Sequence, residues 1–174
     1  EERYDDTRKR LAGTPLPPTA YLMGKVGLVL VAGVIQALLL VLIGRVAFAI
    51  PFPSGERLVT FAWVLLLGLI TSAIAGIAVA QLPRSAKSAS TVITPVVLVL
   101  QFVSGVYLPF SLMPSWIQNI AALFPLKWLA QGMRSVFLPD ALASIEPGGT
   151  WNHGGIVLVL ALWLILGAVV ARAM

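Results

Sequence analysis

Long stretches of apolar residues without a single charge dominate the chain. Residues 26–44 form a run of 19, which as a helix would be about 28 Å long and would match a ~30 Å hydrocarbon layer. Residues 58–82 hold 25 and residues 154–171 hold 18, both within the ~17–25 that a membrane helix needs. The pattern predicts an all-α, polytopic membrane helical bundle with spans over 26–50, 58–82 and 154–171.

A further charge-free run, residues 88–126, is 39 residues long and exceeds what one crossing requires. Pro109 and Pro114 divide it, because proline lacks the N–H donor that a continuing helix needs. The expected span is 91–108, with a kink at Pro95. The chain would then cross the membrane four times.

The segment 109–139 contains two helix-like apolar stretches, residues 115–124 and 126–138, each too short to cross a membrane. They form either a re-entrant helical hairpin covered by neighbouring spans or an interfacial amphipathic pair. In the second arrangement Trp116 and Trp128 lie at headgroup level. The pattern alone does not choose between the two.

Basic residues fall unevenly on the two sides of the four predicted spans. Eight lie on the side of the chain ends and four on the opposite side, where residues 140–153 are expected to form an exposed outer loop. Because Lys and Arg are enriched in cytoplasmic loops, both ends are predicted in the cytosol of a multi-pass plasma-membrane protein. The eight are Arg3, Arg8, Lys9, Arg10, Lys25, Arg84, Lys87 and Arg172, and the four are Arg45, Arg57, Lys127 and Arg134.

The composition supports this class of protein. Hydrophobic residues make up 59% against a usual ~45–50%, and charged residues 11% against about 25%, which excludes a soluble domain and intrinsic disorder. The net charge of +5 follows from membrane topology, and its dispersal around the spans argues against nucleic-acid binding. With no cysteine and a single histidine, neither disulfides nor a metal cluster is expected.

Polar residues well inside the predicted spans are few, and none is Asp, Glu, Lys or His. Such residues either hydrogen-bond to neighbouring helices or contact a transported substrate, and both interpretations stay open. The candidates for a substrate path are Gln36, Gln101 and Ser104. Ion-coupled transport would lack its usual carboxylates.

Small residues recur at intervals of four along the second predicted span. A ridge of this kind lets two helices approach closely in lipid, where apolar burial does not drive association. We expect it to pack within the subunit or across a dimer. Its members are Gly68, Ser72, Gly76 and Ala80.

No grouping of residues favours catalysis. Asp140 or Glu146 could meet His153 on the outer face, but exposed loop residues are the far commoner explanation of all three. The sequence contains no GxxxxGK[ST] phosphate-binding motif, so energy from ATP would have to come from a partner.

The start of the chain is suited to contact such a partner. Residues 4–11 are compatible with a short helix, which Gly13 and Pro15 would end before a second helix begins at residues 17–19. Because proline fixes the backbone, a force on the short helix would reach the first span. An ordinary solvated loop is the alternative.

Two strings resemble the permease subunits of type-2 ATP-binding-cassette exporters, especially the daunorubicin-resistance-like drug exporters. RLAGTPLPPTAYLMGK, residues 10–25, is similar to the cytosolic turn between the second and third spans of that family. SGVYLPFSLMPSWIQNIAALFPLKWLAQGMRSVFLP, residues 104–139, is similar to the outer segment before the last span. The resemblance covers the whole chain.

The resemblance implies a permease of six spans, of which these are the last four, with an amino-terminal helix and two spans before Glu1. It implies that the hairpin is re-entrant and that residues 1–25 couple to a separate ATPase, which carries ATP and magnesium. Two permeases and two ATPases would export a hydrophobic or amphipathic substrate, such as a drug, a lipid or a lipid-linked glycan. The implied coupling residues are Arg8, Arg10, Leu11, Thr14, Pro15 and Leu16.

Two other classes of protein stay open. A secondary transporter fits the apolar spans but would need ligands for a coupling ion. A non-transporting membrane scaffold or enzyme would make the proline-rich elbow a simple loop.

Overall fold

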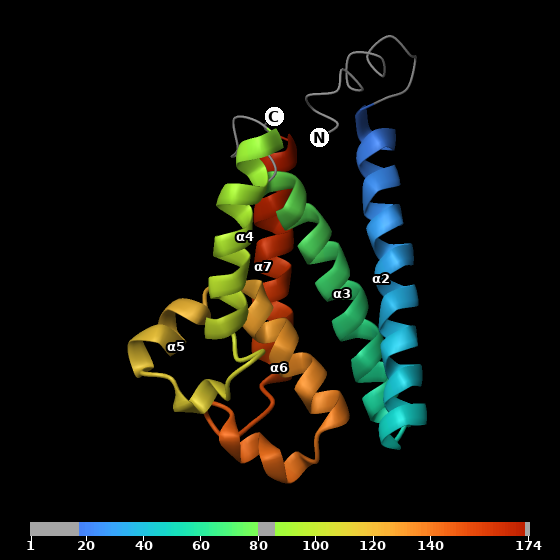
Figure 1. The fold of residues 1–174 in the computed structure, drawn as a ribbon, viewed down its shortest axis with the longest axis vertical. Helices are drawn as coiled ribbons and strands as arrows, with labels where there is room; N and C mark the ends of the chain where they lie inside the picture. The colour runs from blue at the N-terminus through green and yellow to red at the C-terminus, as the bar shows by residue number, and fades with distance from the viewer. Residues whose placement is uncertain (1–17, 80–85, 173–174) are drawn as a thin grey trace.

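The computed structural model describes residues 18–79 and 86–172, and this part of the chain is helical (Figure 1). Six α-helices are joined by turns, and two 3₁₀ helices lie in the connections. The α-helices are α2 (Pro18–Phe48), α3 (Glu56–Val79), α4 (Ala86–Val103), α5 (Ser115–Ala121), α6 (Pro125–Phe137) and α7 (His153–Arg172), and the 3₁₀ helices are η1 (Phe110–Leu112) and η2 (Asp140–Ile145).

Among the described residues, three helices are long and apolar enough to cross a membrane, and they confirm helices of membrane length at three of the predicted spans. The stretches of sufficient length are Met23–Phe48, Glu56–Ile77 and His153–Val170. The fourth predicted span, 91–108, is shorter than expected, because α4 ends at Val103 and its apolar part is Ile93–Val103. Gly105 has φ +77, a left-handed conformation that directs the chain out of the helix.

The helices run in alternating directions (Figure 1). The start of α2, the end of α3, the start of α4 and the end of α7 lie at one end of the bundle. The α2–α3 connection and η2 lie toward the other end, which we call the loop end. The long helices α2, α3, α4 and α7 therefore alternate in direction along the chain.

Glycines bring α3, α6 and α7 into close contact. A Cβ atom on Gly132 of α6 would lie 2.8 Å from Val64 of α3 and 3.5 Å from Ile156 of α7. Farther along, a Cβ atom on Gly167 of α7 would lie 2.5 Å from Ile74 of α3. Because backbones approach most closely at residues without side chains, these positions set the spacing of the three helices.

Helix α6 lies antiparallel beside the first half of α3. Arg57 donates from Nη1 to the carbonyl oxygen of Leu138 at 3.0 Å, and the rings of Phe61 and Phe137 meet edge to face at 5.9 Å. Deeper along α3, Gly68 faces Leu129. The start of α6 therefore lies well inside the length of α3.

Helix α2 packs on α3 without entering the core. Gly33 lies against Leu69, but no α2 residue whose exposure is described is buried. The helix ends where Ala49 adopts φ +54 and the N–H of Ile50 bonds back to the carbonyl of Gly44 at 3.2 Å. This left-handed cap satisfies a carbonyl at the helix end.

The ridge of small residues on α3 is divided in the structure. Gly68 is buried against Leu129 of α6, whereas Ser72 is exposed and Gly76 faces open space. Ala80 lies outside the described residues. Packing within the subunit thus involves Gly68, and the part of the ridge that contains Ser72 and Gly76 is left uncovered by the described residues.

Candidate functional site

The polar face of α6 is buried. Lys127, Gln131, Arg134 and Ser135 recur at helical spacing, so they form one stripe on an otherwise apolar helix. Such a stripe usually faces water, but Lys127, Gln131 and Ser135 are almost fully enclosed. We call these four residues the polar stripe.

Lys127 is held between aromatic rings at the first turn of α6. Its Nζ donates to Oε1 of Gln131 at 2.6 Å and lies 3.6 Å from the ring centre of Trp128 and 5.2 Å from that of Phe110. The ammonium group is therefore stabilised by ring faces and one amide instead of water.

Arg134 joins three segments of the chain. Its Nε donates to Oε1 of Glu146 at 2.6 Å, and its Nη1 donates to the carbonyl of Gly105 at 2.9 Å. Glu146 is only 5% exposed, and its Oε2, like Nη2 of Arg134, is buried without a protein partner. This buried ion pair ties α6 to the turn after α4 and to the segment after η2.

The remaining stripe residues fix the connection to α7. Nε2 of Gln131 donates to the carbonyls of Thr150 at 3.3 Å and Trp151 at 3.1 Å. The hydroxyl of Ser135 lies 3.1 Å from Nε2 of His153. The loop predicted over 140–153 is thus anchored along α6, and Glu146 is buried where an exposed residue was expected.

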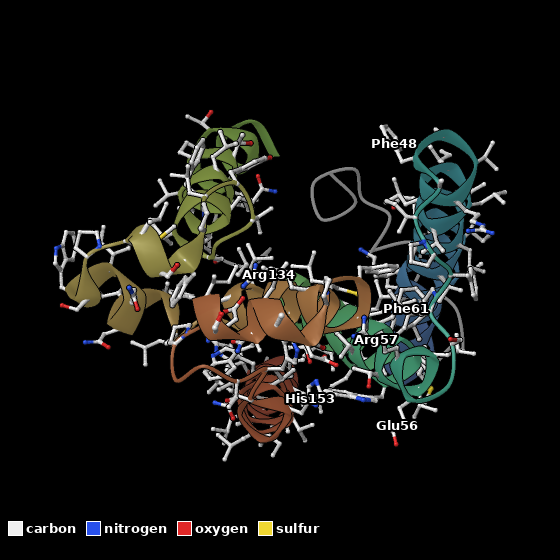
Figure 2. All side chains as sticks on the ribbon, turned by 90° about the horizontal axis from the view of Figure 1, so that it is seen from below. Phe48, Glu56, Arg57, Phe61, Arg134 and His153 are labelled. Carbon is white, nitrogen blue, oxygen red and sulfur yellow. The ribbon has the colours of Figure 1, made fainter. Side chains whose placement is uncertain are left out.

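The three outer residues considered for catalysis have separate partners. Asp140 pairs with Arg57 at 3.2 Å, Glu146 pairs with Arg134, and His153 contacts Ser135. Figure 2 shows Arg134 and His153 on opposite sides of α6. Among the described residues, no group of three His, Cys, Asp or Glu side chains is placed to hold a metal ion.

Two tryptophans complete the turn between α5 and α6. The indole N–H of Trp128 donates to the carbonyl of Ala122 at 2.7 Å, and that of Trp163 on α7 donates to the carbonyl of Leu123 at 2.7 Å. Trp163 lies in the middle of α7, so the α5–α6 turn reaches about half of the length of that helix. Both carbonyl groups lie at the end of α5, where a helix leaves its last carbonyls without intrahelical hydrogen bonds.

The structure does not unite the three predicted substrate-path residues. Gln36 is exposed on α2, which lies on the other side of α3 from α4 (Figure 1). At the end of α4, Gln101 is half-buried and accepts from the hydroxyl of Tyr107 at 3.3 Å, and the buried hydroxyl of Ser104 has no hydrogen-bond partner among the described residues. The implied coupling residues at positions 8–16 lie outside the described residues.

Sequence reasoning missed the polar stripe as a unit. It treated Lys127 and Arg134 only as outer charges, although the spacing of polar residues over 127–135 already indicated one helix face. Periodicity cannot tell whether water or protein covers that face. The residues that cover this face come from two connections. Gly105 and Phe110 lie between α4 and α5, and Glu146 lies between α6 and α7.

Comparison with known proteins relates the chain to membrane transporters. The family model described as ABC-2 family transporter protein matches residues 1–173. The chain is similar to the probable multidrug ABC transporter permease YbhR of Escherichia coli strain K12, with 26% identity over 151 residues, 86% of this chain and 40% of that protein. The permease of the same name from Escherichia coli O157:H7 matches to the same extent. The chain spans about two fifths of the length of these relatives, and no solved structure matches it.

Proposed function

Because the chain belongs to the ABC-2 family of transporter proteins, we propose that it forms part of the permease subunit of an ATP-driven exporter. The family match over residues 1–173 is the observation that carries this proposal. Three helices of membrane length support it, since a permease must span the bilayer. The multidrug designation of the relative supports export of a hydrophobic or amphipathic compound, such as a drug, a lipid or a lipid-linked glycan.

We further propose that the α5–α6 hairpin re-enters the membrane from the loop end. The support is its position beside α3 and α7, with the turn next to Trp163 in the middle of α7. Non-helical backbone at membrane depth requires protein cover and hydrogen-bond donors. The indole N–H groups of Trp128 and Trp163 supply such donors.

The assembly is proposed to contain two permeases and two ATPases in the plasma membrane, with ATP and magnesium on the ATPases. Both ends of the chain would lie in the cytosol, and the chain would hold the last four of six spans. The residues proposed to transmit force are Arg8, Arg10, Leu11, Thr14, Pro15 and Leu16.

The path of the substrate is proposed between two copies of the permease. The exposed apolar surfaces of α2 and α4 support this, since they leave Gln36 and Gln101 accessible to a neighbouring subunit. Lys127 and Arg134 of α6 are engaged with partners within the chain, so they do not offer a free charge to a substrate. A neutral or amphipathic cargo therefore suits the proposed path best.

Co-purification tests the proposal directly. The affinity-tagged full-length protein should bring down an ATP-hydrolysing subunit, and Leu11→Asp or Leu16→Asp should weaken that association and stop export. Export should stop when ATP hydrolysis is blocked and continue when the proton gradient is collapsed. Dependence on the gradient would favour a secondary transporter, and transport without any ATPase would refute the proposal.

Gln101→Glu is expected to impair export of a neutral drug while leaving assembly intact. A carboxylate at this half-buried position would introduce a charge at membrane depth, which is costly. Drug efflux and the amount of co-purified ATPase are the two measurements. Unchanged efflux would remove Gln101 from the proposed path.

A further inference from the structure

A cavity of about 380 Å³ lies between α2, α3 and α6 in the loop half of the bundle. This volume falls within the ~300–1,000 Å³ range of ligand pockets. All residues that line it are apolar, and they come from three elements and the α2–α3 connection. They include Ala37, Gly44, Ile50, Phe61, Met133 and Phe137.

The walls of the cavity differ in how they meet the rest of the molecule. Phe61 and Phe137 form an edge-to-face pair that joins α3 to α6. Helix α2 forms the opposite wall, and its apolar side chains are exposed both at the cavity, as at Leu40, and away from it, as at Leu38. The cavity therefore lies directly behind a helix whose outer surface is suited to lipid.

A cation lies beside this apolar cavity. Arg57 is one helical turn before Phe61, and its Nη1 donates to the carbonyl of Leu138, the residue after Phe137. Figure 2 shows Arg57 and Phe61 together between α3 and α6. The guanidinium group thus lies next to the aromatic pair, on the side of the loop end.

Arg57 retains the capacity to bind an anion. Its Nη2 lies 3.2 Å from Oδ1 of Asp140, but that carboxylate side chain is 80% exposed. Exposed ion pairs contribute at most about 1 kcal/mol, so another anion can displace Asp140 at small cost. The guanidinium also has more N–H donors than these two contacts use.

We propose that the cavity holds an acyl chain of a phospholipid whose phosphate binds Arg57. An apolar tail gains little by leaving lipid for an apolar protein surface, so the headgroup contact must retain it. Arginine matches the geometry of a phosphate group and forms strong charge-assisted hydrogen bonds with it. The phospholipid is a resident of the permease and is independent of the cargo of the proposed function.

Native mass spectrometry tests this site. The full-length protein is reconstituted in nanodiscs of phosphatidylethanolamine and phosphatidylglycerol, extracted in detergent and weighed. The wild type should retain a phospholipid, and Arg57→Gln should lower its occupancy about tenfold, as expected for loss of a charged hydrogen bond. Ala37→Phe, which fills the cavity, should lower occupancy to a similar degree.

Matched variants separate this site from general lipid contact. Leu38→Phe adds an aromatic ring to the exposed face of α2, and Arg45→Gln removes an exposed cation, so both should retain the lipid. If Ala37→Phe fails to fold, Ile50→Trp fills the cavity from the connection and must give the same loss.

Three results would overturn the proposal. They are an empty wild-type protein, equal occupancy in the cavity and control variants, and displacement of the lipid by an exported compound, which would make the cavity a substrate site. Because lipid retention is measured without export, its failure is distinguishable from failure of the proposed function.

Discussion

Glu146→Leu is expected to lower the free energy of unfolding by about 3–5 kcal/mol, because it leaves the guanidinium of Arg134 buried without its counter-ion. The same loss should free the segment after η2 from α6 and reduce export. Replacing both partners, as Arg134→Met with Glu146→Leu, should cost less than either single change, since no uncompensated charge stays in the protein. Thermal unfolding of the full-length protein and substrate efflux measure the two effects.

The exposed pair on the same end of the molecule provides the control. Asp140→Asn removes the partner of Arg57, and because the Asp140 side chain is 80% exposed, the cost should be at most about 1 kcal/mol. Equal losses in Glu146→Leu and Asp140→Asn would show that burial does not strengthen the Arg134 pair. A double variant no more stable than the single variants would contradict the assignment of the loss to an isolated charge.

Gly132→Leu is expected to destabilise the contact of α3, α6 and α7 by about 3 kcal/mol. A Cβ atom at this position would already lie 2.8 Å from Val64 and 3.5 Å from Ile156. Val64 is β-branched and has little rotamer freedom in a helix, so it cannot move aside cheaply. The apparent melting temperature of the full-length protein and limited proteolysis of the α5–α6 hairpin measure the result.

Gly27→Leu is the matched control for this substitution. Gly27 lies in α2, and a Cβ atom added there would meet nothing within 4 Å, so the new side chain extends into open space. Its stability should stay close to that of the wild type. If Gly27→Leu were as damaging as Gly132→Leu, the effect would come from helical leucine in general and not from the three-helix contact.

The membrane-length helices followed directly from hydropathy, because charge-free runs of this length have few other stable structures. The two hairpin helices were also predicted, and α5 and α6 lie close to the expected stretches 115–124 and 126–138. The end of α4 was not predicted, since the run is apolar up to Leu108 and the positive φ of Gly105 ends the helix first.

The buried polar stripe shows where sequence patterns become insufficient. Lys127 and Arg134 have the spacing of a solvent-exposed face, and only tertiary packing places Phe110, Gly105 and Glu146 over them. Tertiary packing also divides the small-residue ridge. Gly68 meets Leu129, whereas Gly76, farther along the same helix face, meets nothing among the described residues of the subunit.

The tryptophans at the hairpin turn affect how topology is assigned from sequence in proteins of this kind. Tryptophans near helix ends are commonly taken to mark the level of the lipid headgroups. Trp128, in the first turn of α6, donates its indole N–H to the carbonyl of Ala122, and Trp163, in the middle of α7, donates to that of Leu123, so both side chains are positioned by hydrogen bonds to the hairpin turn. In the re-entrant arrangement proposed above, an aromatic-belt rule applied to Trp128 would set the boundary of the bilayer too deep.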